Sequence, residues 1–253
     1  MSRTLLQWIG SATLVLALVG TSHAASVTTT LTGYKGGVIQ TTFGNVTVQG
    51  GAGALQWQVQ SDADGQLVYG PDSTFITFCI EAAESIQLNH TYDYAVVDPA
   101  LAPNDGWPQM GEQRAGLLTG WFAAYYQGDS LSDWTNTQAM AFQMGVWEIV
   151  AETTDAFDLV SGFHTIGNQA VARDLAQAWL DDEAAWQGGN TPHSFVLKAM
   201  TSPWPDVAGN NIQDQVFFVV ATAPAPSAVF GGLGLLGTLS VVRWRRRRQA
   251  DLA

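Results

Sequence analysis

The hydrophobic pattern of this chain changes its period twice, and these changes limit the folds that the chain can adopt. From residue 26 to about residue 78, apolar and polar residues alternate between glycine-rich turns, a pattern typical of β-strands. After Pro108 the apolar residues recur at helical spacing, and short β-rich runs return near residue 194. This order predicts an α+β fold, in which a sandwich-like or barrel-like β-sheet carries a helical insertion.

The individual elements can be placed from the same pattern. Strands are predicted at residues 27–31, 38–42, 46–48, 55–59, 74–81, 194–200 and 215–222, and helices at residues 113–126, 134–152 and 168–185. The run at residues 74–81 is apolar nearly throughout, so we expect a central strand there. In the third helix, the apolar face is expected to consist of Val171, Leu175, Ala178 and Trp179.

The first 24 residues have the features of a signal peptide. Arg3 supplies a positive charge, residues 5–20 are apolar, and residues 22–24 place small side chains where a signal peptidase reads. We expect cleavage after Ala24 and export of the remainder of the chain. An uncleaved anchor or a buried first helix is the alternative.

The last thirty residues have the features of a membrane-associated targeting signal. A proline-bearing linker at residues 221–227 leads into an apolar run at residues 228–242, and an arginine-rich tail follows at residues 243–253. The apolar run contains four glycines and is shorter than the roughly 20 residues of a stable transmembrane helix. The positive-inside rule keeps the arginines cytoplasmic and leaves the ectodomain, residues 25–220, outside.

This tail resembles the PEP-CTERM sorting signal, in which a proline strip, a short span and terminal arginines occur together. The strip here is Pro224, Ala225 and Pro226, and Ala225 stands where the family has Glu. The resemblance implies processing by an exosortase-type enzyme and delivery to the surface of a Gram-negative bacterium that makes exopolysaccharide. It also implies that the membrane segment is a transient anchor.

The charge of the exported part excludes several partners. Residues 25–242 hold 21 acidic residues against four basic ones, a net charge of −17. Such a surface argues against binding to nucleic acid or to anionic lipid. The sequence contains no DxDxDG-type calcium loop, no histidine pair at metal-ligand spacing and no phosphate-binding or dinucleotide-binding motif. No metal or cofactor is therefore predicted.

Cys79 is the only cysteine of the chain. An exported protein with one cysteine cannot close an internal disulfide, so the thiol is idle, intermolecular or committed to other chemistry. The Phe-Cys-Ile-Glu sequence at residues 78–81 resembles the first motif of bacterial thioester domains. The Phe-Gln-Met-Gly-Val-Trp sequence at residues 142–147 resembles their second motif. The resemblance covers roughly residues 70–220, with a helix between the motifs and a closing strand near residues 211–215.

This resemblance implies that the Cys79 sulfur attacks the side-chain carboxamide of Gln143 and that ammonia leaves. The resulting thioester is a better electrophile than the amide, and an amine-bearing partner can later discharge it. Adhesion or assembly of an extracellular matrix or biofilm is the implied role, without enzymatic turnover beyond self-catalysed bond formation. Gln138, five residues earlier, is a competing candidate whose surroundings match the motif less well.

The neighbours of the two motif residues suit this chemistry. A thioester needs a site that excludes water, and Phe78, Phe142 and Trp147 are apolar. A helix places Trp147 one turn from Gln143. Glu81 and Glu148 are candidates to orient the reacting groups or to move a proton, although a structural or solvated carboxylate is the alternative for each.

Three other interpretations remain open from the sequence. Cys79 and Gln143 could be inert parts of a non-covalent structural module. A carbohydrate-binding module could use tryptophans expected in exposed loops, namely Trp107, Trp186 and Trp204. A cysteine-dependent hydrolase would need one of three histidines near Cys79, namely His90, His164 or His193.

Overall fold

The computed structural model describes residues 25–62, 70–82, 84–103, 108–152, 156–187, 195–202 and 212–220. The strands are β1 (Ala25–Phe43), β2 (Val46–Asp62), β3 (Thr74–Cys79), β4 (Thr91–Val97), β5 (His164–Ile166), β6 (Phe195–Thr201) and β7 (Gln215–Val220). The helices are α1 (Gly111–Tyr125), α2 (Asn136–Ala151), α3 (Ala170–Asp181) and α4 (Glu183–Trp186), with short 3-10 turns η1 (Pro99–Leu101) and η2 (Leu131–Asp133). The predicted signal peptide, linker, membrane span and arginine-rich tail lie outside the described residues.

The strands form one antiparallel sheet that closes on itself. Their order is β2-β3-β7-β6-β4-β1-β5, and β1 also pairs with β2. The long strand β1 makes this possible because its first six residues pair with β4 while almost its whole length pairs with β2. Gly36 and Gly53 lie opposite each other, where an added Cβ would come within about 2 Å of the facing backbone. Glycine is therefore required at this close approach of two strands.

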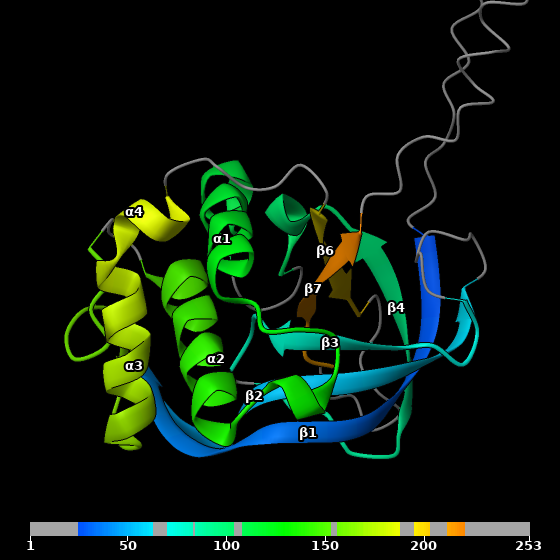
Figure 1. Cartoon of the computed structure of the whole chain (residues 1–253), viewed down its shortest axis with the longest axis horizontal. Coiled ribbons are helices and arrows are strands. Elements are labelled where there is room, and N and C mark those ends of the chain that lie inside the picture. Colours follow the sequence, from blue (N-terminus) through cyan, green and yellow to red (C-terminus); the bar gives the residue numbers. More distant parts are fainter. Residues whose placement is uncertain are drawn as a thin grey trace, which may run out of the picture.

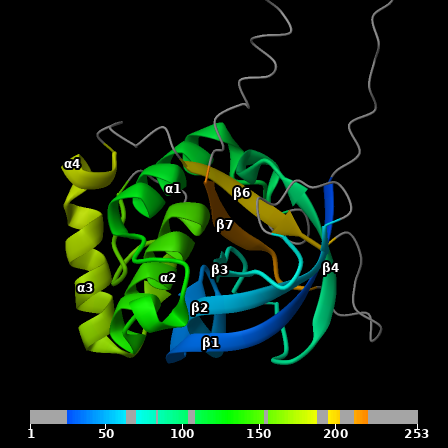
Figure 2. The same ribbon diagram turned by 45° about the vertical axis from the view of Figure 1, so that its right-hand side comes forward.

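The helices cover one side of the sheet. Figure 1 shows α3 outermost, α2 inside it, and α2 lying over β1 and β2, and the rotated view in Figure 2 agrees. Eleven consecutive residues of α2, from Ala139 to Ile149, are buried. All of these residues except Gln143 and Glu148 are apolar, as expected for a helix in such a central position. A capping box between Thr135 and Gln138 defines where α2 begins.

The mixed α/β architecture dominated by an antiparallel sheet confirms the coarse fold prediction. The separate strands expected at residues 27–31 and 38–42 are one continuous strand, as are those at 46–48 and 55–59. Strands β4 and β5 were not predicted. Within the parts of the chain that the structure describes, no helix is long and apolar enough to span a membrane.

The predicted apolar face of the third helix is only partly correct, because Leu175 and Trp179 pack against the core whereas Val171 and Ala178 are exposed. Val171 is 75 % exposed, whereas the buried residues of α3 are Ala172, Ala176 and Leu180. The sequence contains two overlapping sets of apolar residues at helical spacing, and the set with smaller side chains faces the protein. Small residues allow α3 to pack closely on α2, and the larger Trp179 packs on Trp121 and Tyr125 of α1.

Candidate functional site

Cys79 lies at the end of a strand that is buried on both faces. β3 pairs with β2 on one side and with β7 on the other, and Cys79 lies opposite Gln215 of β7. Beyond the end of the strand, the Ile80 N–H donates to the Asp214 carbonyl over 3.0 Å, so residues 213–215 continue alongside residues 79–81. This pairing brings two polar side chains of the closing segment, Gln213 and Gln215, next to the thiol.

Gln143 binds the main chain of Cys79 at both of its amide atoms. The Cys79 N–H donates to Gln143 Oε1 over 2.9 Å, and Gln143 Nε2 donates to the Cys79 carbonyl over 2.7 Å. Gln143 is fully buried in the middle of α2, and Cys79 is 5 % exposed. The motif residues predicted from the sequence are therefore adjacent, and the carbonyl oxygen of the Gln143 carboxamide is polarised by a backbone donor.

The thiol itself contacts two other glutamines that the sequence did not identify as site residues. Cys79 Sγ donates to Gln213 Oε1 over 2.8 Å, and Gln215 Nε2 donates to Cys79 Sγ over 3.5 Å. Gln213 Nε2 also donates to the Glu81 carbonyl. The alternation of Gln213, Asp214 and Gln215 in a strand-like segment was the available signal, because it places both glutamines on one face.

A chain of buried hydrogen bonds supports these glutamines from behind. Trp57 Nε1 donates to Thr77 Oγ1 over 2.7 Å, and Thr77 Oγ1 donates to Gln215 Oε1 over 3.0 Å. Each of these three side chains is fully buried. Because a buried polar network is costly to break when fully satisfied, this chain fixes the position of Gln215 at the sulfur.

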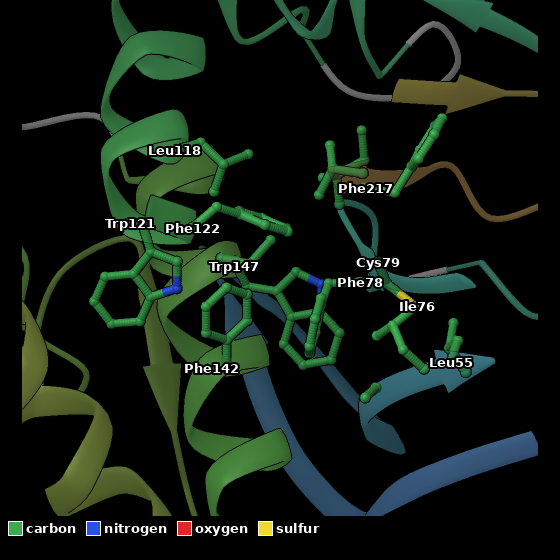
Figure 3. Close-up of a cluster of buried hydrophobic side chains, with 14 of the residues drawn as sticks. Leu55, Ile76, Phe78, Cys79, Leu118, Trp121, Phe122, Phe142, Trp147 and Phe217 are labelled. Carbon is green, nitrogen blue, oxygen red and sulfur yellow. The ribbon is translucent and has the colours of Figure 1, made fainter. Parts of the chain in front are cut away.

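The aromatic residues predicted around the site are buried close to it, but they do not all face the thiol. Successive strand residues point to opposite faces, so Phe78 points away from the thiol and packs on Phe142 of α2 with ring centroids 4.4 Å apart. Figure 3 shows Phe78 together with rings from α1 and α2. Trp147 is 3 % exposed and lines a cavity that also reaches Cys79. The packing of Phe78 on Phe142 therefore excludes water from the helix-facing side of β3, whereas the thiol borders the cavity.

Burial raises the pKa of the Cys79 thiol to about 12, and the hydrogen bond from Gln215 opposes part of this rise. The resting thiol is consequently neutral at physiological pH. Attack by sulfur therefore requires that the thiol proton move in the same step.

Glu81 is buried two residues beyond Cys79. Burial raises its pKa from 4.5 to about 10, and the nearby carboxyl groups of Glu84 and Asp214 act in the same direction. The Asp214 N–H donates to Glu81 Oε2 over 3.2 Å. Glu81 is therefore an uncharged acid near neutral pH, which suits the predicted role in proton movement.

Replacing Glu81 with Gln is expected to stabilise the protein at about pH 8 while leaving its stability near pH 4.5 almost unchanged. A carboxyl whose pKa is raised by folding contributes fully below its unfolded pKa, and that contribution is lost as the pH rises toward the folded pKa near 10. Gln cannot ionise, so the loss disappears. Urea unfolding of both proteins at the two pH values measures this, and parallel pH profiles would contradict it.

Glu148, the other candidate to orient the reacting groups or to move a proton, bonds to His164. It accepts from His164 Nδ1 over 2.7 Å, and His164 Nε2 contacts Thr41 Oγ1 at 2.9 Å. Both side chains are fully buried, and Glu148 also accepts from the Asp158 N–H over 2.8 Å. Burial raises the pKa of Glu148, which His164 opposes. These bonds join α2, β1 and β5, so the geometry gives Glu148 a structural position.

Most of the histidines and tryptophans on which the alternative interpretations depend are not where those interpretations need them. Among the described residues, neither His90, which is exposed, nor His164 bonds to Cys79, and His193 lies outside this part of the chain. The expectation of an exposed Trp186 is wrong, because it is 3 % exposed and its Nε1 donates to the Leu180 carbonyl. Trp107 and Trp204 lie outside the described residues.

Gln138, the competing glutamine, is placed away from the thiol. Its Oε1 accepts from the N–H and the hydroxyl of Thr135 over 3.1 and 2.8 Å. This is the capping box of α2, and it gives Gln138 a local structural role.

Within the described ranges, no group of three or more His, Cys, Asp or Glu side chains is arranged to hold a metal ion. Comparisons with protein-family models, with curated proteins and with solved structures found no match for this chain. Its function therefore has to be inferred from the geometry of its own residues.

Proposed function

We propose that this chain is an exported surface protein whose ectodomain stores an internal thioester between Cys79 and Gln143 for covalent attachment to an amine-bearing partner. The observation that carries the proposal is the 2.9 Å hydrogen bond from the Cys79 N–H to Gln143 Oε1. It holds the carboxamide of one residue at the residue that bears the thiol, inside a buried site.

The bond-forming step can be written with these groups. Cys79 Sγ attacks the side-chain carbonyl carbon of Gln143, and negative charge develops on Oε1. The Cys79 N–H already donates to that oxygen, as an oxyanion-stabilising donor does. The C–N bond then breaks, the thiol proton passes to the departing nitrogen, and ammonia leaves. Glu81, uncharged near neutral pH, is the proposed proton shuttle.

The proposed cellular setting comes from the two ends of the chain. A signal peptide at residues 1–24 and a PEP-CTERM-like tail with Pro224, Ala225 and Pro226 support export, an exosortase-type partner and display at a Gram-negative cell surface. The exported part, with its excess of acidic residues, would then present the thioester to partners in the extracellular matrix or on another surface.

The intact mass of the purified protein tests the thioester. We expect a mass that is short by one ammonia, addition of methylamine on incubation with that amine, and neither change in Cys79→Ala. Tandem mass spectrometry then locates the methylamide. A label on Gln143 supports the proposal. A label on Gln213, which contacts the thiol directly, would show that the thioester forms with Gln213 instead. An unmodified mass with a thiol titratable only after unfolding would contradict the proposal and leave Gln143 as a structural clamp.

A further inference from the structure

The side-chain amide of Gln215 has a fixed orientation, and the hydrogen bonds behind it decide which end faces the thiol. The indole Nε1 of Trp57 can only donate, so Thr77 Oγ1 accepts from it over 2.7 Å. The Thr77 hydroxyl has a single proton, which it donates to Gln215 Oε1 over 3.0 Å. The amide oxygen therefore faces Thr77, and Gln215 Nε2 donates to Cys79 Sγ over 3.5 Å.

Gln213 presents the opposite end of its amide to the same sulfur. Its Nε2 donates to the Glu81 carbonyl, so its Oε1 faces the thiol and accepts the thiol proton over 2.8 Å. The sulfur therefore lies between one acceptor and one donor. Of these two groups, only the Gln215 donor stabilises negative charge on the sulfur, because the Gln213 oxygen repels it.

The ionisable neighbours of the thiol do not provide such stabilisation. Burial raises the pKa of the Cys79 thiol to about 12, and the acidic Glu81 acts in the same direction, whereas the hydrogen bond from Gln215 opposes the rise. Tyr34 and Tyr94 also interact with the thiol, and a tyrosine never carries a positive charge. Among the described residues that line the cavity at Cys79, none is Lys, Arg or His.

We propose that Gln215 is a catalytic hydrogen-bond donor that stabilises the negative charge on Cys79 Sγ when the thioester forms and when it opens. The inference rests on the proposed thioester, and it assigns control of the reactivity of that bond to a residue outside the two sequence motifs. Thr77 and Trp57 are positioning residues, because they act through Gln215.

The donor is not consumed in this role. When an amine opens the thioester, its nitrogen attacks the side-chain carbonyl carbon of Gln143, and the C–S bond breaks with both electrons passing to the sulfur. The hydrogen bond from Gln215 strengthens as this charge develops. The sulfur then takes a proton from the attacking nitrogen, which leaves an amide and a free thiol. Because the uncharged sulfur of the thioester accepts only weakly, the donor favours the transition state over the stored bond.

The rate of methylamine incorporation into the full-length protein tests this role. Gln215→Met keeps the length of the side chain but removes the donor, and we expect its thioester to open about tenfold more slowly than that of wild type. Gln213→Met instead removes an oxygen that repels the departing sulfur, so its thioester should open at least as fast as that of wild type. Rates are measured on the fraction that has lost ammonia. Equal slowing in both variants, as loss of a merely structural glutamine would cause, would overturn the inference.

Two substitutions of Thr77 provide a test that leaves Gln215 in place. Thr77→Val keeps the shape of the side chain but removes the hydroxyl, so the Gln215 amide is free to turn its oxygen toward the sulfur. We expect Thr77→Val to open more slowly than wild type and Thr77→Ser, which keeps the hydroxyl, to restore the rate. Equal opening rates in these two variants would contradict the positioning role of Thr77 and the fixed orientation of Gln215.

Alkylation of the free thiol separates this inference from the thioester itself. After methylamine treatment, Cys79 carries a free thiol whether or not a thioester had formed, and iodoacetamide then reports the thiolate fraction. At about pH 8, we expect Gln215→Met to lower the alkylation rate about tenfold, which corresponds to a rise of about one unit in the thiol pKa, and Gln213→Met to raise the rate. If wild type has lost no ammonia but these rates differ as expected, the thioester fails and Gln215 keeps its role at the sulfur. If the thioester forms but neither opening nor alkylation depends on Gln215, this inference fails alone.

Discussion

Replacing Gln143 with Glu is expected to abolish the loss of ammonia. In a Cys79→Ala background, where the Gln143 carboxamide stays intact, the same replacement is expected to destabilise the protein by about 3 kcal/mol at about pH 8. Glu has no amide nitrogen to leave, so no thioester forms spontaneously. Its ionised carboxylate can accept from the Cys79 N–H but cannot donate to the Cys79 carbonyl, which Gln143 Nε2 now reaches over 2.7 Å. A fully buried charge would face a carbonyl oxygen, and this repulsion accounts for the lost stability.

The destabilisation should shrink as the pH falls toward about 4, because a protonated Glu can donate its O–H to the Cys79 carbonyl. Intact mass and urea unfolding at the two pH values measure both effects. Gln138→Glu is the matched control on the same helix. Its carboxylate can still accept from Thr135 in the capping box, so stability and ammonia loss should stay close to wild type. Retained ammonia loss in Gln143→Glu would show that another carboxamide reacts.

Replacing Gly120 with Ala is expected to destabilise the protein by about 3 kcal/mol. Gly120 is buried on α1, and an added Cβ would lie 1.9 Å from the Trp186 carbonyl oxygen of α4. The obstacle is backbone, so no side-chain rotation can relieve it. Helices α1 and α4 would have to separate, which would disturb Trp186 and Trp121, whose rings are 5.8 Å apart.

Gly116 provides the control for this substitution because it lies one turn earlier on α1. It is exposed, and an added Cβ there meets no atom within 4 Å. Gly116→Ala should therefore raise the free energy of unfolding by about 0.5 to 1 kcal/mol, because Ala loses less backbone entropy than Gly in a helix. Equal effects of the two substitutions in urea unfolding would show that α1 and α4 do not pack as closely as the structure indicates.

The helices were easier to predict than the strands. α2 was expected at residues 134–152 and spans Asn136–Ala151, because its apolar run is long and its capping box is local in sequence. The continuity of β1 could not be predicted in this way. Gly36 and Gly37 indicate a turn when only local sequence is considered, whereas pairing with the glycines of β2 keeps the strand extended.

The candidate site was only partly accessible from the sequence. The resemblance to thioester domains selected Cys79 and Gln143, and the structure places them in contact. The alternation at residues 213–215 indicates only that Gln213 and Gln215 share a face. The proximity of Gln213 to the sulfur depends on the register between β3 and β7, which are more than 130 residues apart in the chain. Trp186 was misplaced because neighbouring glycines suggested a loop, whereas its burial depends on α1.

The position of Gln143 in the middle of α2 has a mechanical consequence. A partner joined to Gln143 would pull on a helix whose side chains are buried on all sides and which lies over β1 and β2. Tension between the partner and the cell would therefore load the interior of the domain, and detachment by force would require the whole fold to be pulled apart.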